Sequence, residues 1–305
     1  MAAATDPHVS TEAPRSPRRA PRSTRVTRYA WYLAPGWLLL LAVVVVPMLL
    51  GLWLSLHNGS LTSANSAFVG VENYTRLLTS SRFWGAVRVT LLVSVLSLAI
   101  QLPLGFLLAV LVHRELVGTR FFRSSLLLPL LLTPVAVGLM WRLMMNVDNG
   151  VIDGVLQTLG LPAVDWLGNR TMAVVSVVIV DSWQNTPFVM LLLLAGLQSL
   201  PTGPQEAALV DGASRWQVYR HVILPMLAPV GLVVVMVRVI ESVKLFDIIY
   251  ILTSGGPGTA TQNLSMLDYR FGFTYLQTSQ AATLGVVITL CLIPMYRLWK
   301  KANAQ

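Results

Sequence analysis

Six long apolar runs alternate with polar segments along the chain, and they cover roughly residues 29–56, 86–113, 121–145, 171–198, 226–252 and 276–298. About 20 apolar residues are needed to cross the hydrocarbon core of a bilayer as a helix. Helix is the expected conformation because an isolated span must satisfy its own backbone hydrogen bonds in lipid. The pattern predicts an all-α membrane protein with six transmembrane helices, in which residues 29–298 form one transmembrane domain.

The composition agrees with this pattern. Of 305 residues, 55% are hydrophobic and 11% are charged, and the mean hydropathy is +0.66, whereas about 25% of the residues of a soluble domain are charged. The single cysteine, Cys291, lies in an apolar run. A disulfide framework and a cysteine-based metal site are therefore not expected.

Basic residues are distributed unequally between the connections. The tail 1–28, the connections after the second and fourth runs and the C-terminus carry 14 of them, whereas the opposite side carries four. Because Lys and Arg concentrate on the cytoplasmic side of a membrane, both termini and the segment 199–225 are expected in the cytoplasm. The Pro-, Ser- and Arg-rich tail 1–28 is expected to be disordered and to contact lipid rather than nucleic acid. Residues 299–305 form a short cytoplasmic tail.

Sequence motifs of enzymes are missing from the chain. It contains no HExxH, no GxSxG, no Walker lysine loop and no cluster of His and Cys, and its four histidines are scattered. Neither a catalytic site nor a metal site is expected. Transport of a solute would take its energy from an ion gradient or from another chain.

The polar segment 199–225 carries two helix-start signals, and the first of them lies at Gly203. Gly203 suits an N-cap, Pro204 suits the first helical position, and Glu206 places a negative charge in the first turn. Asp211-Gly212 ends this helix, since glycine tolerates a left-handed C-terminal conformation.

The second start signal is Ser214-x-x-Gln217, which reads as a capping box. The segment thus predicts two short helices at an angle, joined at Gly212, before Pro225 opens the fifth span. Small side chains at three alanines, Ala207, Ala208 and Ala213, would let another surface approach the backbone closely. An amphipathic connector at the membrane surface is the alternative interpretation.

The string EAALVDGASRWQVYRHVILP, residues 206–225, resembles the EAA loop of binding-protein-dependent ABC importer permeases. The matching residues are Glu206, Ala207, Ala208, Asp211, Gly212, Ala213, Ile223, Leu224 and Pro225. FVGVENYTRLL (68–78) and FDIIYILTSGGPG (246–258) resemble the carbohydrate-uptake subgroup that includes the maltose permease subunits. The resemblance extends from the first span to the sixth and implies the type I ABC importer permease fold.

This resemblance also implies partners and a role for the loop. The EAA loop of the family forms a coupling helix that docks in a groove on a separate ATPase, with Glu206 expected to pair with a basic group there. ATP and Mg²⁺ would bind that ATPase, so this chain is expected to be a transport subunit without a cofactor and without enzyme activity. A second, homologous permease completing a heterodimer, two ATPases and an extracellular solute-binding protein are the implied partners, in a bacterial cell membrane.

Four charged residues lie in the fifth run, and three of them, Glu241, Lys244 and Asp247, are candidates for the substrate path. Arg238, Glu241, Lys244 and Asp247 are spaced by three and alternate in sign. Such neighbours on a helix can pair with one another. This charge ladder would therefore either form ion pairs among its own members or line the path of a sugar with polar groups. Lys244 and Asp247 match positions where maltose-type permeases place sugar-contacting polar residues, although here they are charged rather than amides.

The fourth run contributes DSWQNTPF, residues 181–188. Trp183 offers a flat face, and Gln184 and Asn185 offer donors and acceptors, at a depth comparable to that of Glu241. A shared site between the fourth and fifth spans is therefore predicted; the alternative is that Trp183 only packs against neighbouring helices. Trp141 and Arg142 would line an entrance, or Arg142 would snorkel to the interface.

The leading functional hypothesis is a permease that translocates a mono-, di- or oligosaccharide by alternating access. An importer of another solute, such as glycerol phosphate or a polyol, is the alternative within the same class. A stand-alone ion-coupled transporter that uses the charge ladder is the alternative from another class. The EAA loop argues against this last alternative.

Overall fold

A computed structural model describes residues 24–59, 67–113 and 119–302. Two compact units divide the chain, residues 1–50 and residues 51–305, and each is described by itself. The described part of the first unit is the helix α1 (Thr24–Ser55) as far as Leu50. The window of α1 over Tyr32–Ser55 has a mean hydropathy of 2.6 and is only 6% buried, which suits contact with lipid.

The second unit is built from helices, with one short hairpin of the strands β1 (His57–Asn58) and β2 (Ala67–Phe68). Its first helices are α2 (Glu72–Leu78), α3 (Ser81–His113), α4 (Thr119–Leu131), α5 (Pro134–Met144), α6 (Val151–Thr158) and α7 (Arg170–Ser199). They are followed by α8 (Gly203–Val210), α9 (Arg215–Val218), the π-helix η1 (Tyr219–Ile223), α10 (Leu224–Val243), α11 (Asp247–Thr253), α12 (Leu264–Tyr269), the π-helix η2 (Arg270–Thr274) and α13 (Thr278–Ala302).

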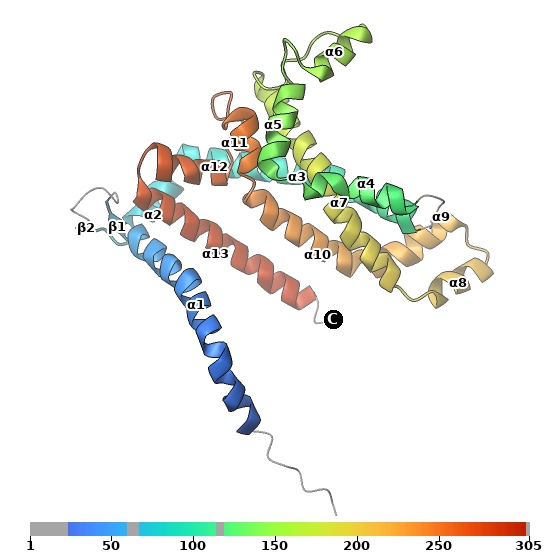
Figure 1. Ribbon diagram of the computed structural model, residues 1–305, viewed down its shortest axis with the longest axis horizontal. Coiled ribbons are helices and arrows are strands. Elements are labelled where there is room, and N and C mark those ends of the chain that lie inside the picture. Colours follow the sequence, from blue (N-terminus) through green and yellow to red (C-terminus); the bar gives the residue numbers. More distant parts are fainter. Residues whose placement is uncertain (1–23, 60–66, 114–118, 303–305) are drawn as a thin grey trace, which may run out of the picture. The chain divides into compact units, whose positions relative to one another are not determined.

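Helix α7 is the central element of this unit. It packs most extensively against α3, and it also contacts α4, α5, α10 and α11. It runs from the neighbourhood of α5 and α11 to the start of α8 (Figure 1). Two thirds of its 18-residue apolar window is buried, compared with 28% for α3.

Two glycines permit close helix contacts. A Cβ on Gly105 of α3 would lie 2.6 Å from Val189 of α7, and a Cβ on Gly138 of α5 would lie 2.9 Å from Ile251 of α11. Both positions therefore require the absence of a side chain. The α5–α11 contact also holds the two helices that flank the site described below.

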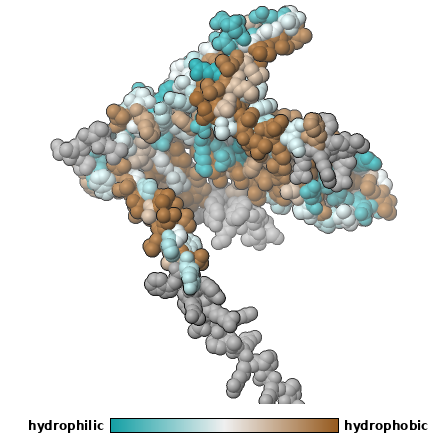
Figure 2. Space-filling model, viewed as in Figure 1, coloured by the Kyte–Doolittle hydropathy of each residue, from teal (hydrophilic) through white to brown (hydrophobic). Residues whose placement is uncertain are grey.

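Within the part of the chain that the structure describes, four helices are long and apolar enough to cross a membrane, or five if the bent pair α4–α5 counts as one span. The described apolar part of the sixth predicted run, Thr278–Pro294 in α13, is shorter than the other four. Hydrophobic side chains dominate the visible surface of α4 and α5, while hydrophilic ones gather around α8 and α9 (Figure 2). This distribution fits a membrane body with a polar region at residues 199–225, which are called the EAA segment below.

Two of the predicted spans are broken rather than continuous. The run 121–145 contains α4 and α5, whose axes differ by 99°. The break falls at Thr133, which is extended (φ −66°, ψ 141°) and precedes Pro134 at the start of α5. A residue before proline is disfavoured in the helical region, which explains the position of the bend.

The run 226–252 is the second broken span, because α10 ends at Val243 and α11 begins at Asp247. Ending a helix frees carbonyl groups that need hydrogen-bond partners. The Val243 carbonyl accepts from the Ser265 hydroxyl at 2.6 Å, and the Leu245 carbonyl accepts from Asn263 Nδ2 at 2.5 Å. The segment after α11 thus stabilises the break.

Candidate functional site

A cavity of about 130 Å³ lies at the break between α10 and α11. It is lined by Pro134 of α5, by Asp181, Gln184 and Asn185 of α7, by Arg238 and Glu241 of α10, and by residues 244–248. Five of the six residues predicted for the substrate path line it: Gln184, Asn185, Glu241, Lys244 and Asp247. These residues come from two separate runs of sequence, so the cavity lies between the helices of the fourth and fifth predicted spans.

An ion pair between Asp181 and Arg238 forms one wall of the cavity. Nη2 of Arg238 lies 3.2 Å from each carboxylate oxygen of Asp181. The side chain of Arg238 is 3% exposed and that of Asp181 is 1% exposed. Two charges at such depth require both a partner and further hydrogen bonds, because their desolvation is costly.

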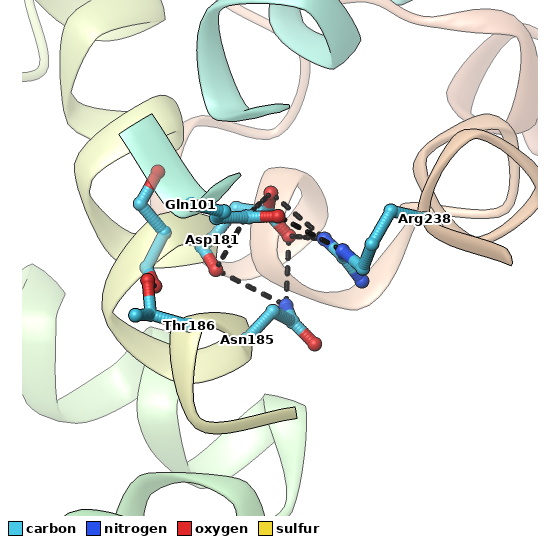
Figure 3. Close-up of polar contacts among 6 residues, drawn as sticks. Gln101, Asp181, Asn185, Thr186 and Arg238 are labelled. Carbon is cyan, nitrogen blue, oxygen red and sulfur yellow. Dashed lines mark hydrogen bonds and ion pairs between the residues drawn. The ribbon is translucent and has the colours of Figure 1, made fainter. Parts of the chain in front are cut away.

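Gln101 of α3 and Asn185 supply those further hydrogen bonds (Figure 3). Gln101 Nε2 donates to Asp181 at 2.9 Å, and Gln101 Oε1 accepts from Arg238 Nε at 2.9 Å. Asn185 Nδ2 donates to Asp181 at 2.9 Å. The network joins α3, α7 and α10 through buried polar groups, so it holds the three helices in one register.

Glu241, Lys244 and Asp247 are exposed, and within the described ranges none of the three takes part in an ion pair. The self-pairing ladder is therefore not what the structure shows, since Arg238 pairs across to α7 instead of with Glu241. The reason is geometric: α10 ends at Val243, so Asp247 begins a different helix. These three charged side chains remain available to a ligand.

Trp183 does not line the cavity. Its ring meets the ring of Trp141 edge-on, with centroids 5.7 Å apart, and it packs against a cluster of buried residues from α5, α7 and α11. This position agrees with the packing alternative. Arg142 is exposed, and its Nη1 donates to the carbonyl of Ile251 in α11 at 3.1 Å, so it links α5 to α11.

The sequence pattern did not reveal Gln101, and it did not identify the partner of Asp181. Gln101 is 0% exposed and lies in the middle of the second apolar run. A single amide or carboxylate inside a membrane span is itself a signal, since such residues are expensive there and face a partner. Among the described residues, no group of His, Cys, Asp and Glu could hold a metal ion.

The EAA segment has the predicted helix–turn–helix form. Helix α8 ends in a complete Schellman motif: the N–H of Gly212 donates to the Leu209 carbonyl at 3.1 Å, and the N–H of Ala213 donates to the Ala208 carbonyl at 3.0 Å. Gly212 has φ +85°, a left-handed conformation that favours glycine. The expected hinge residue thus terminates the first short helix.

The second start signal is also confirmed. Ser214 N–H donates to the side chain of Gln217 at 2.7 Å, and Gln217 N–H donates to the Ser214 hydroxyl at 3.4 Å, which together form the capping box. Two details differ from the prediction. Thr202 rather than Gly203 occupies the N-cap of α8. The helix that starts after Ser214 continues through η1 into α10. It is therefore the first part of the fifth span rather than a separate helix.

The residues of the EAA segment that were predicted to couple to an ATPase divide into an inner and an outer face. Ala208 and Ala213 are half-buried against a core cluster that includes Val218 and Ile223. The predicted residues that remain exposed are Glu206, Ala207, Asp211, Gly212, Leu224 and Pro225. Three large apolar side chains are exposed beside them: Leu209 (50%), Val210 (87%) and Trp216 (68%). A rigid element with an apolar outer face is suited to docking against another protein.

Comparison with known proteins gives a consistent result. Residues 101–301 match the family model described as the binding-protein-dependent transport system inner membrane component. The chain is 39% identical over 294 residues to a probable ABC transporter permease protein of Sinorhizobium fredii, which covers 94% of this chain and 95% of that protein. It is 38% identical over 231 residues to the trehalose/maltose transport system permease protein MalF of Thermococcus litoralis, which covers 76% and 78%.

Solved structures show the same fold. The chain aligns with the crystal structure of a bacterial ABC transporter involved in the import of the acidic polysaccharide alginate, with a TM-score of 0.76, 22% identity, and coverage of 90% of this chain and 97% of that one. A second structure of the alginate transporter, in complex with an alginate pentasaccharide-bound periplasmic protein, aligns with the same TM-score. The family model covers well over half of the chain, and the chain therefore belongs to the inner membrane components of binding-protein-dependent transport systems, as an ABC importer permease.

Proposed function

We propose that this permease translocates a mono-, di- or oligosaccharide, delivered by an extracellular solute-binding protein, through the cavity between α7 and the α10–α11 break. The observation that carries the proposal is the convergence of Gln184, Asn185, Glu241, Lys244 and Asp247 on one cavity. Amide and charged groups bind sugar hydroxyls through hydrogen bonds, and a small number of convergent polar groups is typical of ligand sites. The relative from Thermococcus litoralis is named for trehalose and maltose transport.

The EAA segment is proposed to couple this cavity to ATP hydrolysis on a partner chain. Its exposed apolar side chains, Leu209, Val210 and Trp216, would dock on the ATPase beside Glu206. Val218 and Ile223 are buried in the same cluster as residues of α3 and α7, so a displacement of the docked loop would move packed helices as a body. ATP and Mg²⁺ would bind the partner, and this chain would bind no cofactor.

The proposed assembly contains this chain, a second homologous permease, two ATPases and the solute-binding protein, in a bacterial cell membrane with both termini in the cytoplasm. The described helices support one half of a transmembrane path, and α1 and α3 keep many apolar side chains exposed for lipid or for the second permease. No nucleic acid is part of the proposal.

Reconstitution tests the proposal directly. The complete complex in proteoliposomes, with ATP on the side of the ATPases, is expected to accumulate radiolabelled trehalose or maltose only when the solute-binding protein is present. Gln184→Ala should lower uptake at least about tenfold, because a buried amide that recognises a hydroxyl gives strong discrimination. Uptake that follows an ion gradient without ATP would instead support the stand-alone transporter.

The coupling role has its own test. Glu206→Lys and Gly212→Pro are each expected to lower ATP-driven uptake while leaving membrane insertion intact. Asp148→Lys changes an exposed acidic residue in the turn between α5 and α6, so it is the matched control and should retain uptake. Normal transport by both EAA variants would show that the segment does not couple the two activities.

A further inference from the structure

The amide oxygen of Gln184 is an unused acceptor at the cavity. Gln184 is 5% exposed, and its Nε2 donates to the carbonyl of Leu132 at 3.1 Å. A carbonyl only accepts, so this bond fixes which end of the amide faces Leu132. Oε1 is left without a hydrogen-bond partner among the described residues, although it is buried. A buried acceptor of this kind is costly unless a ligand donates to it.

Asn185 is oriented by the same logic. Its Nδ2 donates to the backbone carbonyl of Asp181 at 3.1 Å and to the carboxylate of Asp181 at 2.9 Å, and both of these groups only accept. The amide oxygen of Asn185 therefore points away from Asp181, as Figure 3 shows. Both amides of α7 thus donate to the protein through their NH2 groups, and within the described residues neither amide oxygen accepts a hydrogen bond.

The charged side chains of the cavity likewise favour a ligand that donates hydrogen bonds. Asp181 and Arg238 neutralise each other within the buried network, which leaves Glu241 and Asp247 against the single ammonium of Lys244. The lining therefore offers mostly acceptors and a surplus of negative charge.

We infer that this cavity selects saccharides whose groups donate hydrogen bonds, neutral or amine-bearing ones, and that Glu241 and Asp247 exclude anionic saccharides such as uronates and sugar phosphates. A carboxylate or phosphate brings only acceptor oxygens and like charge, so it meets repulsion rather than hydrogen bonds. A structure of the same fold belongs to an importer of an acidic polysaccharide, so the exclusion must come from these side chains and not from the fold. The inference rests on the proposed function.

The test compares three forms of one sugar on the solubilised complex of both permeases and the two ATPases, without the solute-binding protein. The probes are trehalose and maltose, with derivatives of each in which one primary hydroxyl is replaced by a carboxylate or by an amine. Titration calorimetry is expected to show that the carboxylate form binds at least about tenfold more weakly than its parent, the effect of a like charge several ångströms away at a protein surface.

Variants that remove a negative charge and a variant that removes a positive charge from the cavity should change the relative affinity for the carboxylate form in opposite directions. Glu241→Gln and Asp247→Asn should each lower the ratio of the dissociation constant of the carboxylate form to that of its parent sugar, while Lys244→Gln should raise this ratio. Asp148→Asn removes the same unit of charge from an exposed turn outside the cavity and should leave the ratio unchanged.

Two failures can be told apart. A wild-type complex that neither binds nor transports any saccharide would overturn the proposed function and this inference together. A complex that transports saccharides, but binds the carboxylate form as tightly as its parent, would overturn only the exclusion of anions. That exclusion would also be overturned if the Glu241 and Lys244 variants moved the ratio in the same direction or left it unmoved.

Discussion

The buried pair of Asp181 and Arg238 allows a sharp prediction of stability. Replacing Asp181 by Asn keeps the shape of the side chain but leaves the guanidinium of Arg238 buried at 3% exposure without a negative partner. Replacing Arg238 by Met removes the positive charge instead. Asp181 then retains two donors, Gln101 Nε2 and Asn185 Nδ2, each at 2.9 Å. The two single variants are therefore not equivalent.

The magnitudes follow from this difference. Removing one partner of a buried ion pair costs about 3–5 kcal/mol, because the other charge is left uncompensated. Asp181→Asn should lie near the upper end of that range, and Arg238→Met near about 3 kcal/mol, since the remaining carboxylate is still hydrogen-bonded. At about 2–4 °C per kcal/mol for a unit of this size, the melting temperature should fall by roughly 6–20 °C.

A double-mutant cycle measures the interaction itself. The variant that carries both replacements has no charge left in the network of Gln101, Asp181 and Arg238. It is therefore expected to be more stable than Asp181→Asn alone, with a coupling energy of up to about 3 kcal/mol. The assay is scanning fluorimetry of the purified complex in detergent. Ser97→Ala on α3 is the control, because the buried hydroxyl of Ser97 makes no hydrogen bond within the described residues, and its removal should be nearly neutral.

Additive effects would refute this reasoning. If the double variant lost the sum of the two single losses, the two side chains would act independently, and the network would not be the unit that joins α7 to α10. A double variant less stable than either single variant, while Ser97→Ala remains neutral, would have the same meaning.

Three further predictions concern backbone and surface positions. Gly105→Ala should destabilise the complex by about 1–3 kcal/mol, because its Cβ would lie 2.6 Å from a side chain of α7, whereas Gly85→Ala, with no atom within 4 Å, should be neutral in the same melting assay. A Cβ at Gly212 would meet no atom within 4 Å, but the residue has φ +85°. Gly212→Ala should therefore destabilise the protein by about 1–2 kcal/mol and lower ATP-driven uptake. Gly203→Ala, where a Cβ also meets no atom within 4 Å, should leave both stability and uptake unchanged. Burial raises the pKa of Asp268 from its usual 3.8 to about 6. The native state then holds the proton more tightly than the unfolded chain does. Its contribution to stability is fully present below pH 3.8 and is lost as the pH rises from there through about 6. Relative to Asp268→Asn, the wild-type melting temperature should fall between pH 3.8 and pH 6 and change little above that.

The parts of the fold that depend on local sequence could be predicted. Run length and hydropathy identified the long helices α3 and α7. Cap signals gave the two turns of the EAA segment, because a Schellman motif and a capping box are each closed by hydrogen bonds within six residues. The glycine at 212 was identifiable for the same reason.

The two helix breaks could not be predicted from hydropathy, because an apolar run has the same composition whether its helix is continuous or broken. The break after Val243 depends on hydrogen bonds from Asn263 and Ser265, about 20 residues later. Only Pro134 left a local trace of the other break.

The candidate site was predictable in its residues but not in its pairing. Polar residues inside apolar runs pointed to α7 and α10, and five of the six expected residues line one cavity. The i,i+3 spacing suggested that Arg238 would pair with Glu241, yet its partner Asp181 lies 57 residues away. Such a partner depends on how α7 and α10 pack, and spacing within one helix carries no information on that.

The exposed side chains of the EAA segment also bear on how the transporter is assembled in the cell. Val210 is 87% exposed and Trp216 is 68% exposed in the chain alone, and unassembled apolar surface of this kind is prone to aggregation. If this segment docks on an ATPase as proposed above, a permease that lacks this partner would present an exposed apolar surface, of the type that chaperones and proteases act on. The surface proposed to transmit motion in the finished complex would then also set subunit stoichiometry, because a copy that lacks its partner would be the one removed.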